Sequence, residues 1–262
     1  NLSKDMNPSV LYTPHMDHGR TYTMLTYGSG YDMPYSGYVL AYSDDGIRWT
    51  DGPKTPAIPG YGDIGWFTYD EEDGILRGTV TWDRVPGPAW TQSPDGHEWA
   101  LPRPALLPDQ EDNKRAGGDP RSSTVFHGMP VFRHGPMFLG FLQVLRGHEI
   151  PEQGLDGKMD VQLVCSRNGR DWDHVGNRQP ILELGDEGSW DSGLLWTGNS
   201  LLADGDRMIV YYSGCESSPG TLAKSSWPKS IGMAWWPRDR FVGQVSAGDG
   251  VVVTKPLGNG RH

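Results

Sequence analysis

Apolar residues along this chain gather in short runs that glycine, proline and aspartate separate. Runs of this kind predict β-strands, and no long stretch shows the 3.6-residue periodicity of an amphipathic helix. The expected strands fall into four groups. They cover 22–27 and 38–42; then 64–69, 76–82 and 89–92; then 129–132, 137–144 and 160–165; and finally 194–202, 207–213 and 230–235. The pattern therefore predicts an all-β protein.

One turn pattern recurs between the groups: Ser, any residue, Asp or Asn, Gly, two residues, Trp. It begins at Ser43, Ser93 and Ser166, which are 50 and 73 residues apart. Asp-Gly and Asn-Gly pairs suit the positive φ angles of a tight hairpin, and the Ser and Asp side chains can bond backbone amides of the turn. We interpret the motif as scaffold that joins the third and fourth strands of a repeating unit. Its Trp would pack between neighbouring sheets.

A repeat of about 40–50 residues is typical of a propeller blade. We therefore expect one domain, 1–262, folded as a five-bladed β-propeller of four-stranded antiparallel blades, with a four-bladed ring as the alternative. Strands from the two termini would close the ring and remove exposed sheet edges. The expected blades span approximately 6–52, 60–104, 121–178 and 190–241, with closing strands in 242–257.

The composition excludes some classes of binding partner. The chain has 36 glycines and 21 prolines. Its net charge of −10 would repel phosphate backbones and anionic lipid, so we expect no nucleic-acid or membrane partner. No apolar run reaches the roughly 18 residues of a membrane span. No glycine-rich phosphate loop is present, and no cofactor is expected. The oligomeric state is not predicted.

Two further features bear on the compartment. Cys165 and Cys215 are interpreted as buried thiols, with a disulfide left open. Asn1–Asp5 does not have the composition of a signal peptide. A secreted or periplasmic location would follow if a signal peptide has been removed.

The repeated turns resemble those of the five-bladed propellers of glycoside hydrolase families 32, 43, 68 and 117. Other segments resemble an uncharacterised family-32-like branch. These are Gly62-Asp63, Gly128–Phe132, Gly188–Gly193, Tyr211–Gly214 and Thr254–Leu257. The resemblance implies a propeller that cleaves glycosidic bonds in an oligo- or polysaccharide.

The catalytic motifs of family 32 are altered in this chain. The motif Trp-Met-Asn-Asp-Pro-Asn-Gly has no counterpart near the N-terminus. Gly118 stands where the Arg-Asp-Pro element has Arg, and Glu216 follows Cys215 where the family's acid precedes its Cys. The family's catalytic set therefore does not transfer whole.

Four acids are candidates for catalysis, because most glycosidases use two carboxyl groups that flank the scissile bond. Asp63 and Asp191 each precede an innermost strand, so equivalent positions in two blades would bring them together at the axis. Glu216 follows a second strand at the expected mouth, and Asp119 lies in a polar loop before the third unit. Each has an ordinary structural alternative as a turn or surface residue.

A second set is expected to contact substrate. Aromatic rings stack on sugar faces, Arg can clamp a carboxylate, and His can bond hydroxyls. The candidates are Trp66, Trp82, Arg84, His127, His148, Glu149 and Trp196. His15, Asp17 and His18 are interpreted as a turn, so no metal site is expected.

The sequence favours a glycosidase that acts through paired carboxylates in the propeller funnel. Two alternatives stay open. One is a non-catalytic glycan-binding propeller, because the family-32 nucleophile motif is missing. The other is a lyase on a uronic-acid polymer, with His127 or a Tyr as base and Arg84 neutralising the carboxylate.

Overall fold

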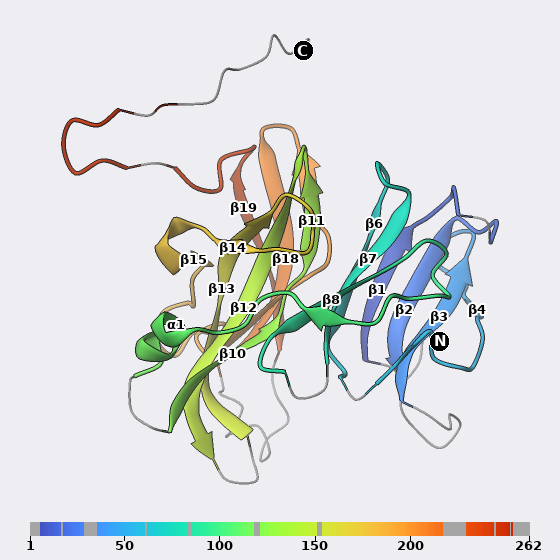
Figure 1. Ribbon diagram of the computed structural model, residues 1–262, viewed down its shortest axis with the longest axis horizontal. Helices are drawn as coiled ribbons and strands as arrows, with labels where there is room; N and C mark the ends of the chain where they lie inside the picture. Colours follow the sequence, from blue (N-terminus) through green and yellow to red (C-terminus); the bar gives the residue numbers. More distant parts are fainter. Residues whose placement is uncertain are drawn as a thin grey trace.

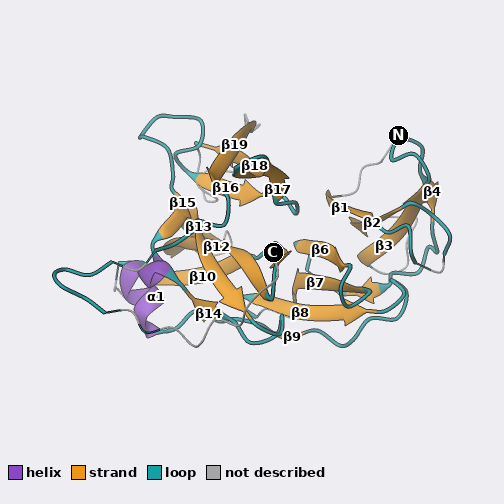
Figure 2. Cartoon of the chain, turned by 90° about the horizontal axis from the view of Figure 1, so that it is seen from above, coloured by secondary structure: helices purple, strands orange, loops and turns teal. Residues whose placement is uncertain are grey.

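A computed structural model describes residues 6–16, 18–28, 36–60, 62–82, 85–117, 121–150, 154–216, 229–243, 245–251 and 253. Its regular structure is almost entirely β-strand (Figure 1). The strands form three sheets, and one parallel pair divides the largest of them into two antiparallel parts. The resulting four antiparallel units are here called blades 1 to 4 (Figure 2). The expected all-β propeller-type fold is confirmed, whereas the number of blades in the complete ring stays a prediction.

Blade 1 contains β1 (Met6–Tyr12), β2 (Tyr22–Gly28), β3 (Gly37–Ser43), β4 (Thr50–Asp51) and β5 (Ile58–Pro59). Blade 2 contains β6 (Gly65–Asp70), β7 (Ile75–Thr81), β8 (Pro88–Ser93) and β9 (Arg103–Pro104). Blade 3 contains β10 (Ser122–Gly128), β11 (Val131–His134), β12 (Met137–Ile150), β13 (Gly154–Ser166), β14 (Asp173–His174) and β15 (Pro180–Leu182). Blade 4 contains β16 (Leu194–Thr197), β17 (Leu202–Asp204), β18 (Arg207–Cys215) and β19 (Ser230–Pro237). The helices are α1 (Gln110–Arg115) and the 3₁₀ turn η1 (Gly176–Arg178).

The three repeated turns have the same hydrogen bonds. In the second turn, the backbone amide of Gly96 donates to Ser93 Oγ at 2.8 Å. Asp95 Oδ1 accepts from the next two amides at 2.8 and 2.9 Å. Matching bonds form at Ser43 and Ser166. The turns lead from β3 to β4, from β8 to β9 and from β13 to β14. In the order of strand pairing, these are the third strand of each blade and its short outer neighbour, as the sequence predicts.

The core consists of apolar clusters within and between adjacent blades. Leu25 and Leu40 of blade 1 pack with Phe67 and Leu76 of blade 2. Blades 3 and 4 share a further cluster built around Phe141. A single parallel pair, Met159 with Leu194, joins blades 3 and 4 into one sheet. Because side chains alternate between the two faces of a strand, the middle blades pack apolar residues on both of their faces.

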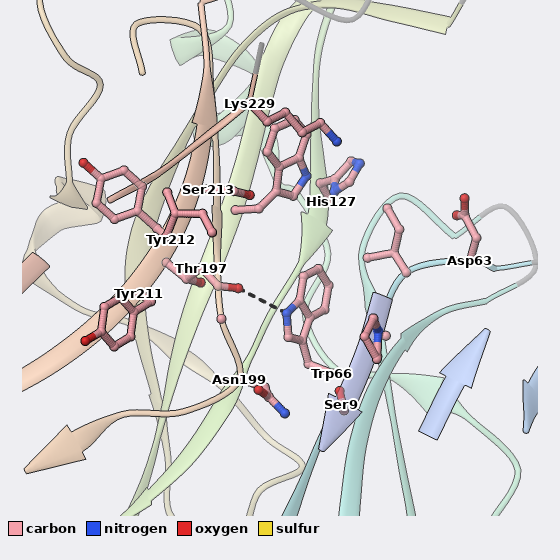
Figure 3. A pocket seen from close by; sticks show the side chains of 16 residues that line it. Ser9, Asp63, Trp66, His127, Thr197, Asn199, Tyr211, Tyr212, Ser213 and Lys229 are labelled. Carbon is pink, nitrogen blue, oxygen red and sulfur yellow. Dashed lines mark hydrogen bonds between the residues drawn. The ribbon is translucent and has the colours of Figure 1, made fainter. Parts of the chain in front are cut away.

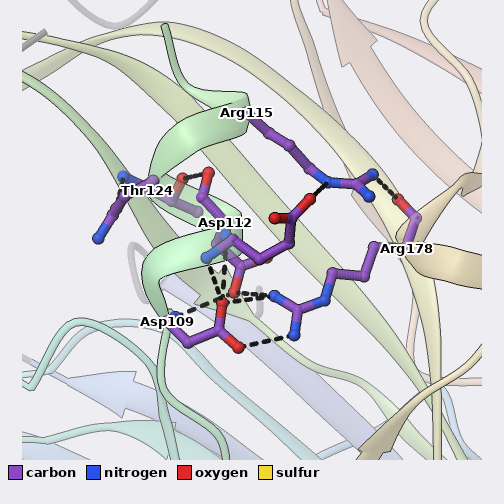
Figure 4. Close-up of polar contacts among 7 residues, drawn as sticks. Asp109, Asp112, Arg115, Thr124 and Arg178 are labelled. Atoms are coloured by element: carbon purple, nitrogen blue, oxygen red, sulfur yellow. Dashed lines mark hydrogen bonds and ion pairs between the residues drawn. The ribbon is translucent and has the colours of Figure 1, made fainter. Parts of the chain in front are cut away.

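The short helix α1 is tied to blade 3 through charged groups (Figure 4). Asp109 caps the helix and forms a capping box with Asp112, whose side chain is fully buried. Arg178 reaches both carboxylates, with nitrogen–oxygen distances of 2.7 Å to Asp109 and 2.8 Å to Asp112. These ion pairs connect α1 to η1, which follows β14 of blade 3.

Blade 4 has an uncovered side. On β19, Ile231, Met233 and Trp235 are 80%, 51% and 49% exposed, and Tyr211 on β18 is 52% exposed. β19 pairs with β18, and no described residue pairs with its other edge. The expected closing segment, 242–257, forms no strand in its described part, and its remaining residues lie outside the described chain.

Both cysteines are free thiols: Cys165 is half-buried on β13, and Cys215 is buried on β18. No described helix has the length and apolar character of a membrane-spanning segment.

Candidate functional site

All four blades contribute to one cavity of about 700 Å³ (Figure 3). Its size is within the range of small-molecule sites. The described residues that line it are Pro8 and Ser9 of blade 1; Asp63, Ile64, Gly65 and Trp66 of blade 2; His127 of blade 3; and Trp196–Asn199, Tyr211–Ser213, Lys229 and Ile231 of blade 4. Residues of all four blades thus line a hollow that is both aromatic and polar.

Trp66 links two blades across this cavity. Its indole Nε1 donates to the carbonyl oxygen of Thr197 at 3.2 Å, and Asn199 donates in turn to the carbonyl of Phe67 at 3.4 Å. The indole lies so close to Gly128 that a Cβ at that position would meet the ring at 2.0 Å. The glycine therefore makes room for the indole of Trp66 at the cavity wall.

His127 enters the cavity wall through an irregularity in β10. The pairing of β10 with β12 shifts register between Phe126 and Gly128, and a bulge of this kind redirects a side chain. The imidazole lies 6.3 Å from the Trp196 ring, centre to centre. Burial lowers the pKa of His127, while the charge of Asp63 acts in the opposite direction. The ring is therefore neutral near pH 7 and suited to hydrogen bonding with hydroxyl groups.

Asp63 is the single carboxylate among the described residues that line the cavity. It is exposed and stands before β6, as the sequence analysis expects. Its charge also contributes to the raised pKa of Tyr38, for which burial is the larger cause. Asp63 thus acts electrostatically on two neighbouring side chains from the rim of the cavity.

Asp191 is held by a separate set of contacts outside the cavity lining. Ser189 Oγ donates to Asp191 Oδ1 at 2.9 Å, and the Tyr212 hydroxyl donates to Oδ2 at 3.0 Å. Trp190 stacks on the Tyr212 ring at 5.6 Å between centres. Burial, together with the bond to Asp191, raises the pKa of Tyr212 to about 12. Asp191 therefore fixes the wall formed by Tyr212.

The remaining expected site residues are more dispersed. Glu216 is exposed at the end of β18 and does not line the cavity. His148 and Glu149 are exposed on β12, where His148 Nδ1 lies 3.0 Å from Ser122 Oγ. Trp82 packs against the cluster between blades 1 and 2. Two others, Asp119 and Arg84, lie outside the described residues.

Several lining residues were not expected from the sequence. They are Ser9, Asn199, Tyr211, Ser213 and Lys229. Lys229 stands at the start of β19, with its Nζ 5.1 Å from the centre of the Trp196 ring. The alternation of side chains along β18, with Tyr211 and Ser213 on one face, is the sequence signal that would have grouped two of them.

No protein-family model matches the sequence, and no curated protein matches it. Solved structures share its fold. A glycoside hydrolase candidate from Parabacteroides distasonis has a TM-score of 0.59 at 18% identity, over 89% of this chain and 69% of that one. A glycosyl hydrolase from Bacteroides ovatus has a TM-score of 0.55 at 16% identity, over 82% of this chain and 63% of that one.

A third similar structure comes from the GH130 family of mannoside phosphorylases. This family contains glycoside hydrolases that target β-1,2-mannosidic linkages in Candida mannan. The TM-score of this structure is 0.53 at 16% identity, over 80% of this chain and 60% of that one. At these identities the likeness establishes the fold alone. The chain spans between 60% and 69% of the length of these three structures.

Proposed function

We propose that this protein processes a glycan, and that it cleaves a glycosidic bond by hydrolysis in the central cavity. The observation that carries the proposal is the meeting of Asp63 with the rings of Trp66, Trp196 and Tyr211 in one hollow. Aromatic faces with a few polar groups are typical of sugar sites. The shared fold with glycoside hydrolases supports the same reading.

Asp63 is assigned to the proton transfer or nucleophilic step at the scissile bond. Hydrolysis with paired carboxyl groups also needs a second acid, for which Asp191 and Glu216 stay the candidates. Water adds across the bond, so one product gains the proton and the other the hydroxyl. His127 and Asn199 would bond sugar hydroxyls and hold the ring against Trp66.

The test is digestion of a glycan panel, with products identified by mass spectrometry. Wild-type protein is expected to add one water for each bond cleaved. Asp63→Asn is expected to lower turnover by at least 100-fold, the scale on which acid–base groups contribute, while glycan binding persists. Asp51→Asn, at an exposed position on β4, is the matched control and should retain full activity.

One observation favours a second candidate, a glycan-binding propeller without catalysis. Among the described lining residues, a single carboxylate faces the cavity. Tight binding with no product from any glycan would support this candidate and refute hydrolysis. Products that lack the added water would instead identify a lyase.

A further inference from the structure

The cavity has a positive and a negative side. Among the described residues that line it, Lys229 alone carries a permanent positive charge, and Asp63 alone carries a carboxylate. In Figure 3 the Lys229 side chain is drawn just above His127, and Asp63 lies to the right of both. A ligand in this cavity therefore has a cation and an acid among the groups around it.

Lys229 has a defined position. Its ammonium group lies 5.1 Å from the centre of the Trp196 ring, which itself lines the cavity. The negative face of an indole attracts a cation at this distance. The lysine side chain is exposed and lines the cavity.

A hydroxyl lies on the strand that pairs with β19 near Lys229. Ser213 of β18 pairs with Ile231, two residues after Lys229, and Ser213 and Lys229 both line the cavity. A cation with a neighbouring hydroxyl donor is a suitable arrangement for a carboxylate. The net charge of −10 repels anions in general, so an anionic ligand needs a local cation of this kind.

We propose that Lys229 binds the carboxylate of an acidic sugar, so that the glycan processed in this cavity contains a uronic acid. The inference rests on the proposed glycan-processing function and names its substrate class. The sugar ring lies on the cavity aromatics, its carboxylate meets Lys229 and Ser213, and the bond to be cleaved faces Asp63. The neutral imidazole of His127 contributes a hydrogen bond and no second positive charge.

The test compares two forms of one oligosaccharide, the uronate and its carboxyl-reduced analogue. Dissociation constants are measured by calorimetry for wild type, Lys229→Met, Lys229→Arg and the control Lys54→Met, whose lysine is exposed and outside the cavity lining. Wild type is expected to prefer the uronate by about 10-fold, within the range of charge-assisted hydrogen bonds. Lys229→Met should abolish this preference, Lys229→Arg should keep most of it, and Lys54→Met should leave it unchanged.

Salt gives an independent readout. The uronate preference of wild type should shrink as sodium chloride rises, because an exposed ion pair is screened. Circular dichroism verifies that each variant is folded. Equal affinity of wild type for both forms, or a Lys229→Met variant that keeps the uronate preference, overturns the proposal.

Binding and turnover separate this inference from the proposed function. Uronate binding that depends on Lys229 without any cleavage upholds the anion site and refutes hydrolysis. Cleavage that does not discriminate between uronate and reduced sugar upholds hydrolysis and refutes the anion site. Cleavage that requires inorganic phosphate and releases a sugar phosphate would assign the cation to free phosphate, and would also overturn the uronate proposal.

Discussion

Replacing Arg178 by Met should destabilise the fold through the buried carboxylate of Asp112. Arg178 is 18% exposed, Asp112 is fully buried and Asp109 is 53% exposed. The half-exposed pair with Asp109 contributes at most about 1 kcal/mol. Removing the partner of a buried charge costs about 3–5 kcal/mol. Because Asp112 keeps its bond from the Asp109 amide at 3.1 Å, we expect a loss near the lower end, about 3 kcal/mol.

The loss is measured by urea unfolding and by the thermal midpoint, which should fall by about 6–12 °C for a chain of this size. The left-handed φ of 57° at Arg178 applies equally to Met, since both side chains are unbranched. Arg115→Met is the control. It breaks an exposed pair with Glu111, four residues earlier in the helix, and a 3.5 Å bond to the carbonyl oxygen of Arg178, and should cost less than about 1 kcal/mol.

Two further results follow from the same reasoning. The double variant with Asp112→Asn should recover part of the lost stability, because the unpaired buried charge is gone. The bonds from Arg178 also hold the pKa of Asp109 well below its usual range. A lowered pKa contributes stability above the unfolded value, about 3.9, and that stability is lost as the pH falls through the folded value. The gap between wild type and Arg178→Met should therefore narrow below about pH 4. A cost for Arg178→Met no larger than that of Arg115→Met would refute the argument.

Three other perturbations test the scaffold around the cavity. Ser93→Ala removes a fully buried hydrogen-bond acceptor from the second repeated turn. It should lower the free energy of unfolding in urea by about 1–2 kcal/mol. A loss below about 0.3 kcal/mol, which is close to the error of such a measurement, would contradict the role of that hydroxyl. Gly128→Ala forces the indole of Trp66 to move, so it should cost about 1–3 kcal/mol and change tryptophan fluorescence, whereas Gly243→Ala, where a Cβ meets nothing within 4 Å, should do neither. Because burial lowers the pKa of His127, this side chain takes up a proton at a higher pH in the unfolded chain than in the folded chain. The free energy of unfolding should therefore drop as the pH falls below about 6.5. The variant His127→Gln should show a smaller drop. If the free energy of unfolding of wild type and variant has the same slope between about pH 7.5 and about pH 5, a range around the free pKa of histidine, the imidazole is not buried in solution.

The sequence predicted those parts of the fold that depend on local interactions. The turns at Ser43, Ser93 and Ser166 have the predicted bonds because Ser, Asp or Asn, and Gly within four residues determine the backbone path. Most strand positions followed from apolar runs bounded by turn residues, but β10, the innermost strand of blade 3, was not among the expected strands. The helix α1 was missed, because a six-residue segment is too short to show a helical period.

The site was less predictable because it is assembled from distant segments. Asp63 was placed at the axis by its position before an innermost strand. Asp191 occupies the corresponding position in another blade, yet the Tyr212 hydroxyl and Ser189 bond its carboxylate. Lys229 reaches the cavity because β19 pairs with β18 in one particular register. Neither the register nor the partner of a given carboxylate follows from local pattern alone.

The uncovered edge and face of β19 also determine where the molecule opens first. β19 has one hydrogen-bonded neighbour among the described strands and three apolar side chains in water, so it has fewer contacts to lose than the middle blades. Its amides should therefore exchange with deuterium through local openings, well below the free energy of global unfolding. Since Lys229 immediately precedes this strand, a ligand held by that lysine would slow the exchange. The strand would then report occupancy of the cavity, which its own residue Ile231 lines.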